Sequence, residues 1–415
     1  MQKRDIIENP NGYKAINAFI FAGSFSLGVM KAGFDLQKVL EISDTQLKDN
    51  AFYFKKNVED VPVVLPSEWE NNEYLNALKN EDIDLMCCNC PCSSLSQINR
   101  NASVDGKNNV HFYRLFNIFE HMQPKVFVIE NAPTLIKLGF PIIRDMVKKL
   151  SHLYNFTVIH DCAGHHEVPM VRMRTLVVGW RKNHFKNSIP IVKLDKHDDV
   201  TVEDTLKDII NDTTNDFKSL TVDDISDLYK YAIPGRSLMT GLAKHWLEDG
   251  KEFTTMLEKR LDGTNHLREV KRIAAKLRDG KNFWDKTPVK LSLNKKFPSL
   301  TSVNEYLHPT QDRALSLREV QRIMCYPDWY DFTDSKHECS IPTTQAIAQG
   351  VPVNFGKYIA NQVKLALDGK LDVIDEDHSQ LNYQDHSKKL MSMFSAEELD
   401  NINSLSIKNE VVKLN

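Results

Sequence analysis

Short apolar runs alternate with amphipathic stretches from residue 17 to residue 180. Six of these runs have the length and composition of buried strands, namely residues 18–21, 38–42, 83–87, 126–129, 156–159 and 175–178. The amphipathic stretches between them are typical of helical crossovers, which join parallel strands and cover both faces of a sheet. The pattern therefore predicts an α/β fold with a doubly wound, mostly parallel sheet.

The pattern changes after Trp180, where polar and charged sequence continues to about residue 310. One amphipathic helix is expected inside this region, with an apolar stripe made of Leu267, Val270, Ile273, Ala274 and Leu277. A second compact helical pattern begins at Arg313. We expect a main domain in two parts, residues 1–185 and 311–370, with a smaller domain, residues 186–310, between them. Residues 371–415 are expected to form a helical C-terminal appendage, with a capping box at residues 395–398.

Composition favours a soluble protein in a reducing compartment. Hydrophobic residues make up 41% of the 415 residues and charged residues 26%, which is ordinary for soluble proteins. The sequence has no apolar leader and no apolar run long enough to span a membrane. Four of the seven cysteines lie between residues 87 and 92, a spacing unlike that of a disulfide framework. We therefore expect a cytosolic protein with no membrane partner.

Charge is distributed unevenly although its sum is only −3. Residues 191–230 contain eleven acidic and five basic residues, whereas residues 251–296 contain thirteen basic and six acidic residues. Such asymmetry can create a local positive surface on a nearly neutral protein. The alternative for any single basic segment is a solvated helical face.

Two strand ends carry side chains suited to covalent chemistry. Cys92 follows the third apolar run and is held by Pro91, and Glu130 ends the fourth run. Ligands of such sheets bind beyond the carboxyl ends of the strands, where Glu41 is also expected. A thiolate and a carboxylic acid are the groups needed to attack and polarise a pyrimidine ring. Taken singly, Cys92 is as well explained as a buried structural thiol, and Glu130 as part of a turn.

Six segments, in the same order, resemble motifs of the DNA cytosine-5 methyltransferase family across roughly residues 15–365. They are the glycine turn at residues 21–34, the nucleophile motif at Cys92, the glutamate motif at Glu130 and Asn131, the paired-arginine motif at residues 168–174, a late helical motif at residues 313–328 and a final motif at residues 346–352. The resemblance implies a Rossmann-like class I methyltransferase fold, with a target-recognition domain before residue 313.

The resemblance also implies roles for particular residues. Catalysis is expected of Cys92, Glu130, Arg172 and Arg174. S-adenosylmethionine is expected to contact Phe21, Ala22, Gly23, Ser24, Phe25, Glu41, Asp84 and Gln349. The target base and its surrounding DNA are expected to contact Pro91, Ser93, Asn131, Arg268 and Arg272.

The implied reaction is transfer of a methyl group from S-adenosylmethionine to C5 of a cytosine flipped out of duplex DNA. The Cys92 thiolate would add to C6 and make C5 nucleophilic, while Glu130 would bind the exocyclic amine and N3. We expect a monomer in the cytoplasm of a bacterial or phage-infected cell, belonging to a restriction–modification, phage or other system.

The chain departs from the family pattern mainly on the cofactor side. Two adjacent glycines are missing from the glycine turn, where Ser24 leads directly into Phe25, and Gln349 replaces an asparagine. Two alternatives therefore stay open: a modified or different alkyl donor, and an inactive DNA-binding relative. An RNA substrate is a third alternative, because cytosine in a loop is already unstacked. No metal site is expected, since the Cys87–Cys90 pair has no second pair at zinc spacing.

Overall fold

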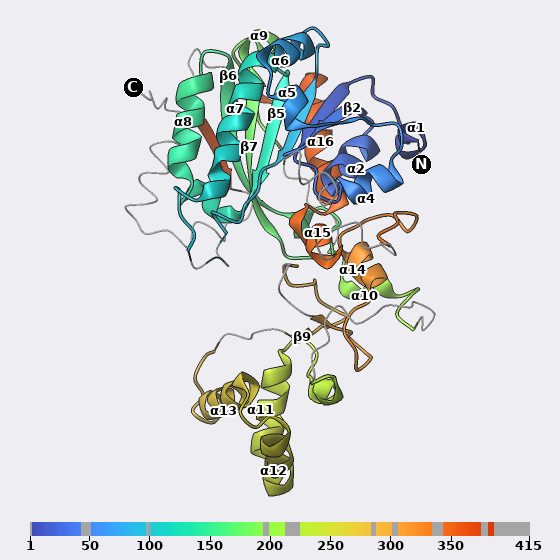
Figure 1. Ribbon diagram of the computed structural model, residues 1–415, viewed down its shortest axis with the longest axis vertical. Helices are drawn as coiled ribbons and strands as arrows, with labels where there is room; N and C mark the ends of the chain where they lie inside the picture. The colour runs from blue at the N-terminus through green and yellow to red at the C-terminus, as the bar shows by residue number, and fades with distance from the viewer. Residues whose placement is uncertain are drawn as a thin grey trace.

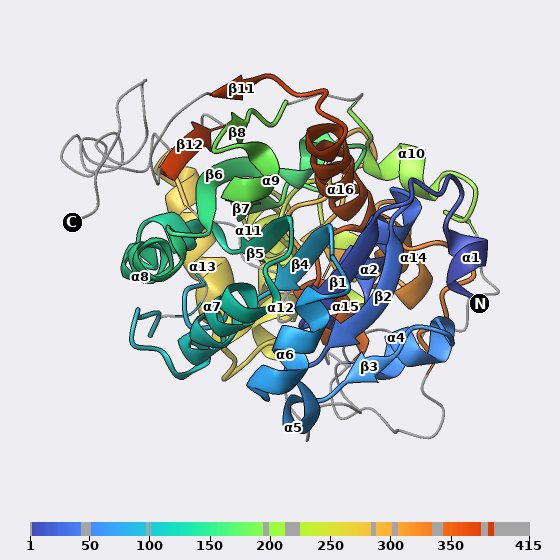
Figure 2. The same cartoon turned by 90° about the horizontal axis from the view of Figure 1, so that it is seen from above.

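The computed structural model describes residues 2–42, 51–96, 99, 101–193, 199–211, 225–283, 288–300, 306–333 and 343–374, and the backbone of residues 381–385. Figure 1 shows a twisted sheet with helices on both faces and a smaller group of helices, α11 to α13, set apart from it. Figure 2 gives the same arrangement from above, with the sheet between α7 and α16. The predicted capping box at residues 395–398 lies outside the described residues.

The sheet has eight strands in the order β12-β6-β7-β5-β4-β1-β2-β3. Only β7 is antiparallel to its neighbours, β5 and β6; every other pair in this sheet is parallel. The prediction of a doubly wound, mostly parallel sheet is confirmed. The strands are β1 (Lys14–Ala18), β2 (Asp35–Leu40), β3 (Val63–Val64), β4 (Leu85–Asn89), β5 (Val126–Asn131), β6 (Tyr154–Cys162), β7 (Met173–Arg181) and β12 (Leu381–Asp385).

The first strand ends where it was predicted to begin. Residues 18–21 were expected to be a strand, but β1 stops at Ala18, and Phe19 and Phe21 have φ values of 62° and 48°. Positive φ is incompatible with an extended strand. The apolar side chains that suggested a strand instead belong to the turn between β1 and the following helix.

Helices cover the two faces of the sheet with separate apolar cores. One core includes α2 and α16, and the other includes α7 and α8. The helices are α1 (Lys3–Ile6), α2 (Ser24–Lys31), α4 (Phe52–Asn57), α5 (Pro66–Trp69), α6 (Asn72–Lys79), α7 (Val110–Met122), α8 (Phe140–Leu150), α9 (Lys182–Phe185), α10 (Val202–Leu206), α11 (Leu238–Glu248), α12 (Gly250–Arg260), α13 (Asn265–Arg278), α14 (Leu317–Ile323), α15 (Thr343–Gln349) and α16 (Val353–Leu367).

Helix α16 brings the C-terminal part of the chain against the first helix of the main domain. Gly28 of α2 makes this possible, because a Cβ atom there would lie 2.6 Å from the backbone oxygen of Val353. No side chain fits at that separation. The two ends of the described chain therefore share one core.

Helices α11, α12 and α13 form a helical unit with its own core, which also includes Ile225, Leu228, Tyr229 and Ala232 before α11 and Leu307 of β10 (Tyr306–Leu307). Val270, Ile273 and Ala274 are buried in that core, and the predicted apolar stripe of this helix is confirmed. Residues flanking the unit, such as Val202 and Leu300, pack in the main core instead. The separately packed unit is thus narrower than the segment 186–310 expected from the pattern.

The two ends of the helical unit lie beside each other. The amide of Leu238 donates to Pro288 O at 2.8 Å, and the amide of Lys290 donates to Arg236 O at 3.0 Å. Short strands β9 (Val289–Lys290) and β10 (Tyr306–Leu307) follow. The unit therefore leaves and re-enters the main body at neighbouring points.

The described part of the C-terminal segment is extended, and the rest of the expected helical appendage lies outside the described residues. Residues 373–374 form β11 (Val373–Ile374), which pairs with β8 (Ile189–Pro190), and β12 adds a parallel strand beside β6. An extended segment at the edge of a sheet is stabilised by backbone hydrogen bonds to the neighbouring strand, even where its side chains do not alternate as in a typical strand. Among the described residues, no helix is long and apolar enough to cross a membrane.

The late helical motif is held by a buried carboxylate, Glu319. Burial alone would raise its pKa, but hydrogen bonds from Arg313, from His308 and from the Ser316 amide outweigh burial and lower the pKa to about 2. A carboxylate with a depressed pKa in the folded state stabilises the protein above its unfolded pKa, and this contribution disappears as the pH falls through the folded pKa.

We therefore expect about 3 kcal/mol of stability at neutral pH to be lost progressively between pH ~5 and pH ~2 through this group. Urea denaturation of the wild type and of Glu319→Gln over that range tests the expectation. The variant should be less stable at pH 7 and should lose less stability on acidification. Glu73→Gln, at an exposed position, is the control and should follow the wild type.

Candidate active site

The ends of three adjacent strands converge at one edge of the sheet. Asn89, the last residue of β4, lies directly opposite Glu130 of β5. Strand β7 runs antiparallel to β5, so its first residues lie beside the last residues of β5, and Asn131 pairs with Thr175. This topology brings Glu130 and Arg174 together although they are far apart in the sequence. The predicted grouping of Cys92, Glu130 and Arg174 agrees with it.

The carboxylate of Glu130 is held on both oxygens. Arg174 Nε lies 2.5 Å from Oε1, and Asn89 Nδ2 donates to Oε2 at 2.9 Å. Glu130 and Asn89 are both buried. A buried carboxylate needs such donors, and a base entering the site must share or replace them.

Cys92 lies three residues beyond Asn89, on a loop whose backbone is hydrogen-bonded to the side chain of Asn131. Asn131 Nδ2 donates to Cys90 O at 2.9 Å, and Asn131 Oδ1 accepts from the Ala132 amide. Both ends of this buried amide are therefore used within the protein. The structure favours a positioning role for Asn131 in place of the predicted contact with substrate.

The Cys92 thiol is partly accessible and electrostatically coupled to its neighbours. Burial raises its pKa above the ordinary value; Arg174 lowers it, Glu130 raises it and Arg172 lowers it again. The thiol is therefore mostly protonated before a substrate arrives, and must lose its proton as it attacks. Cys92 follows the end of β4, the strand end that lies beside Glu130 of β5.

Pro91 and Ser93 flank the nucleophile differently. Pro91 is half-buried and Ser93 is exposed. Ser93 Oγ accepts from Asn108 Nδ2 at 2.5 Å, and Ser93 O accepts from Asn99 Nδ2 at 2.8 Å. Ser93 is exposed, so a substrate could reach it as predicted. Its two hydrogen bonds hold the loop that follows Cys92.

Arg172 occupies a different place from the one predicted. Its guanidinium is buried and donates to three backbone oxygens, Leu300 O at 2.8 Å, Ala348 O at 2.8 Å and Gly350 O at 2.9 Å. Burial lowers its pKa to about 9, so the group stays charged at neutral pH. Two of the three acceptors belong to the final motif, so Arg172 joins the paired-arginine motif to it; Nε is left without a partner among the described residues.

Glu41 has the features of a ribose-binding acid. It lies one residue beyond β2, fully buried, and burial raises its pKa to about 7. Oε1 accepts from the Ile42 amide at 2.6 Å, whereas Oε2 has no hydrogen-bond partner within the described residues. A buried acceptor without a partner is costly, and a ribose hydroxyl would satisfy it. The prediction for Glu41 therefore fits S-adenosylmethionine.

The glycine turn is tightly packed, and its strained residue is Phe21, which has φ 48° without being a glycine. Gly23 has φ 85°, and a Cβ there would lie 2.5 Å from Phe54 Cδ2. Ala22 O accepts from Tyr330 OH at 2.7 Å and from Tyr326 OH at 3.2 Å. Helix α2 begins at Ser24, so the two missing family glycines shorten the turn. Left-handed residues gathered in one turn are typical of ligand-binding loops.

The other predicted cofactor contacts, apart from Asp84, lie either in the glycine turn or in the final motif. Phe21 is half-buried, Ser24 and Phe25 are buried, and Gln349 Oε1 is a buried oxygen without a partner among the described residues. Ser24 also lies against the final motif, since a Cβ on Gly350 would come 2.3 Å from Ser24 Oγ. The glycine turn and the final motif are therefore in contact, as a shared cofactor site requires.

The prediction for Asp84 is wrong. Asp84 precedes β4 and lies at the opposite edge of the sheet, where Oδ2 accepts from the Lys14 amide at 2.7 Å and Oδ1 from Lys125 Nζ at 2.8 Å. Both partners are at strand starts, whereas the cofactor residues follow strand ends. Its carboxylate fixes the beginning of three strands.

Arg268 and Arg272, the predicted DNA contacts, lie on α13 of the helical unit and are exposed. The clustered cysteines are split between the two cores: Cys87 packs in one, and Cys88 and Cys90 pack in the other. No group of three metal-ligating side chains occurs within the ranges that the structure describes.

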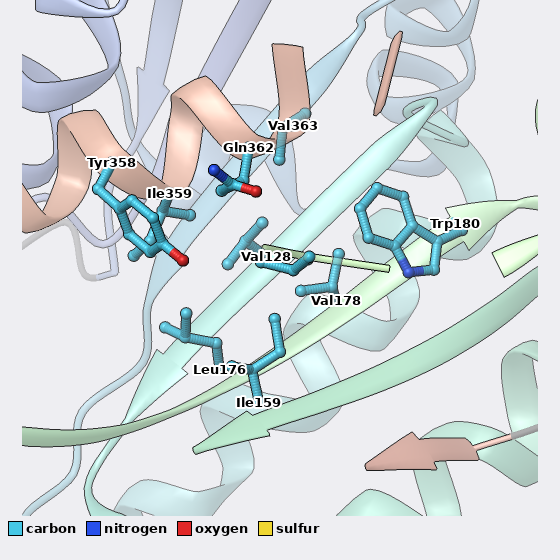
Figure 3. Close-up of a pocket in the computed structure, with 10 residues that line it drawn as sticks. Val128, Ile159, Leu176, Val178, Trp180, Tyr358, Ile359, Gln362 and Val363 are labelled. Carbon is cyan, nitrogen blue, oxygen red and sulfur yellow. The ribbon is translucent and has the colours of Figure 1, made fainter. Parts of the chain in front are cut away.

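A small apolar cavity lies away from these residues, between α16 and the sheet. Figure 3 shows Ile359 and Val363 of α16 facing Val128 and Leu176 of the strands. Its other lining residues are Ile159, Val178, Trp180, Val192, Tyr358 and Gln362. None of the predicted site residues lines it, so it is a packing gap and not the active site.

Comparison with known proteins matches residues 13–365 to the model of one family, described as C-5 cytosine-specific DNA methylase. The chain belongs to this family. The family indicated by the motifs is therefore confirmed. The expected reaction of this methylase is S-adenosylmethionine-dependent methylation of cytosine at C5.

Relatives are similar along most of the methylase. It is 26% identical over 379 residues to the type II methyltransferase M.XorII of Xanthomonas oryzae pv. oryzae, covering 85% of this chain and 84% of that one. It is 24% identical to the putative type II methyltransferase M.MJ0563P of Methanocaldococcus jannaschii, with coverage of 85% and 99%. The fold matches the crystal structure of a putative DNA modification methyltransferase encoded within an E. coli prophage, with a TM-score of 0.57, 21% identity and coverage of 86% and 100%.

Asn89 was missed by the sequence analysis as a site residue, and it has a testable role. Removing its amide in Asn89→Ala leaves Glu130 held by Arg174 alone, so we expect kcat to fall by about 10-fold with little change in the KM for DNA. Steady-state methylation kinetics measure both constants. Asn80→Ala, at an exposed position after α6, is the control, and wild-type kinetics for Asn89→Ala contradict the assignment.

Proposed function

We propose that Cys92 and Glu130 carry out the methylation of an extruded cytosine in duplex DNA. The observation that carries this assignment is the meeting of β4, β5 and β7: a partly accessible thiol, a buried carboxylate and an arginine share one strand-end site. Family membership supplies the reaction, and this geometry supports the residue roles.

Each side chain has a defined task in this proposal. The Cys92 thiol gives up its proton to water as its sulfur bonds to C6 of the base; after C5 has taken the methyl group, the C5 proton passes to water and the sulfur–C6 bond breaks. Glu130 accepts a hydrogen bond from the exocyclic amine and, when protonated, donates to N3, which draws electrons from the ring. Arg174 and Asn89 hold that carboxyl. Attack at C6 breaks the aromaticity of the ring and makes C5 nucleophilic.

S-adenosylmethionine, when bound, supplies the methyl group. Glu41 would hold its ribose through the unpartnered Oε2 atom, and the tightly packed turn at Gly23 would approach its amino-acid end. The shortened turn also fits a modified donor, which stays as the alternative for this site. We propose further that the methylase acts as a monomer on double-stranded DNA in the cytoplasm of a bacterial or phage-infected cell.

Incubation with S-adenosylmethionine carrying a labelled methyl group tests the proposal. Label in duplex DNA, identified as 5-methylcytosine by mass spectrometry of nucleosides, supports it. A covalent adduct with DNA that contains 5-fluorocytosine, without transferred label, favours a different donor. Binding without either product supports an inactive relative, and label in RNA alone contradicts the duplex DNA assignment.

A further inference from the structure

The backbone around Glu41 is fixed by two side chains that lie outside the six motif segments. Trp69, the last residue of α5, donates from Nε1 to Glu41 O at 2.9 Å. Arg114, in the second turn of α7, donates from Nη1 to Ile42 O at 2.6 Å. Both donors therefore act on the two residues that follow β2, at the edge of the sheet where the strands end.

The topology explains why α7 reaches Glu41. Helix α7 connects β4 to β5, which are parallel neighbours, so it must begin at the edge of the sheet where β4 ends. His111 and Arg114, in its first two turns, lie at the same edge as Glu41. Figure 2 shows α5, α6 and α7 together on one face of the sheet, and Trp69 and Phe112 are buried in the same core.

The peptide group between Glu41 and Ile42 is held on both sides. Its carbonyl, Glu41 O, accepts from Trp69, and its N–H, on Ile42, donates to Glu41 Oε1 at 2.6 Å. The carboxylate is thus hydrogen-bonded to the very peptide that Trp69 orients. Since a carboxylate group is rigid, the direction of this one peptide also sets the direction of Oε2, the buried oxygen that has no partner in the described part of the chain.

Arg114 holds the same turn through several contacts at once. Its guanidinium carbon lies 4.8 Å from the centre of the Trp69 ring, and its Nε donates to Glu70 Oε1 at 2.5 Å. Nη1 also lies 3.0 Å from His111 Nδ1, which must be the acceptor because a guanidinium has no acceptor atom. A planar guanidinium can stack on an indole ring and still donate from its N–H groups, whereas an ammonium group cannot make this set of contacts.

We propose that Trp69 and Arg114 are positioning residues of the cofactor site, which fix the turn after β2 so that Glu41 Oε2 is aimed at a ribose hydroxyl of S-adenosylmethionine before the cofactor binds. Glu41 needs this support, because its carboxylate is buried and has a single hydrogen-bond donor among the described residues. An acceptor that is already fixed loses less conformational entropy when the ligand binds. The inference rests on the proposed function, which assigns Glu41 to the ribose.

The test measures the Kd of S-adenosylhomocysteine, the product of methyl transfer, by isothermal titration calorimetry on the full chain without DNA. Arg114→Ala and Arg114→Lys should both raise this Kd by roughly 10-fold, since neither alanine nor lysine replaces the stacked donor. Trp69→Phe should raise it by about the same factor, because it keeps an aromatic ring and removes the donor to Glu41 O. In steady-state assays the KM for S-adenosylmethionine should rise similarly, with kcat and the KM for DNA within about two-fold of the wild type.

A double-mutant cycle distinguishes positioning from a merely structural effect. Glu41→Gln should weaken binding by roughly 10- to 100-fold, and adding Arg114→Ala to it should cause little further loss, because Arg114 acts through Glu41. Arg144→Ala is the matched control, since Arg144 is an exposed arginine of α8 on the same face of the sheet; it should bind like the wild type. Circular dichroism and urea denaturation establish that each variant is folded.

An Arg114→Ala protein that is less stable but keeps the wild-type Kd overturns the inference, and so do equal losses of binding from Arg114→Ala with and without Glu41→Gln. Full binding by Arg114→Lys also contradicts it, since positive charge alone would then suffice. A wild type that binds no S-adenosylhomocysteine overturns it as well. Because the binding assay needs neither Cys92 nor DNA, a wild type that binds but transfers no methyl group contradicts the proposed reaction and not this inference.

Discussion

Replacing Cys92 by alanine is expected to reduce methyl transfer by about 10⁴-fold or more, with DNA binding retained. Without the sulfur no bond to C6 can form, so the ring stays aromatic and C5 stays unreactive. Glu130, Arg174 and Asn89 keep their mutual hydrogen bonds because none of these bonds involves Cys92. Single-turnover transfer of labelled methyl groups, together with a DNA-binding titration, measures both quantities.

Cys325→Ala is the matched control for this experiment. Cys325 is also partly accessible, but it follows α14 and touches Glu167 O and Ile323 O instead of the strand-end site. It should methylate like the wild type. A Cys92→Ala protein that retained more than a few per cent of activity would falsify the assignment of the nucleophile.

Replacing Arg172 by alanine is expected to destabilise the fold by about 3 kcal/mol or more. The change leaves Leu300 O, Ala348 O and Gly350 O buried without their donor, and opens a void where the guanidinium lay. Each orphaned carbonyl costs about 1–3 kcal/mol unless water reaches it. Urea denaturation of the full chain measures the loss.

Arg174→Ala is the informative comparison, since the two arginines are two residues apart and the family resemblance gave them the same role. Arg174 holds Glu130, so its loss should reduce kcat strongly. It also leaves the buried Glu130 carboxylate with Asn89 as its one donor among the described residues, which should cost about 1–3 kcal/mol of stability. If Arg172→Ala were as stable as the wild type and only inactive, the structural role assigned to Arg172 would be wrong.

The apolar pattern predicted the central fold well because parallel strands covered on both faces need uninterrupted apolar sequence. Strand β5 is buried at every position, and residues 126–129 showed it as a continuous apolar run. The pattern failed at residues 18–21, since a packed turn also needs apolar side chains. The sequence does not show that Phe19 and Phe21 adopt positive φ.

Residue type and position after an apolar run singled out Cys92, Glu130 and Glu41, and the structure places each of them at or just beyond the end of a strand. Roles were not predictable where the partner is a backbone atom. The carbonyls that Arg172 and Asn131 contact are absent from any sequence pattern. Asn89 was hidden for another reason, because its role depends on the register between β4 and β5. Asp84 failed because motif order does not reveal at which strand end a side chain lies.

The paired entry and exit of the helical unit, at Arg236 and Lys290, make it a cassette. A different module with closely spaced termini can be inserted there without moving β4, β5 or β7. If the helical unit is the target-recognition domain expected from the sequence, exchanging it would change the sequence preference and leave β4, β5 and β7 in place. A hybrid protein should therefore be spliced outside this core, with Ile225, Leu228, Tyr229, Ala232 and Leu307 exchanged together with α11, α12 and α13.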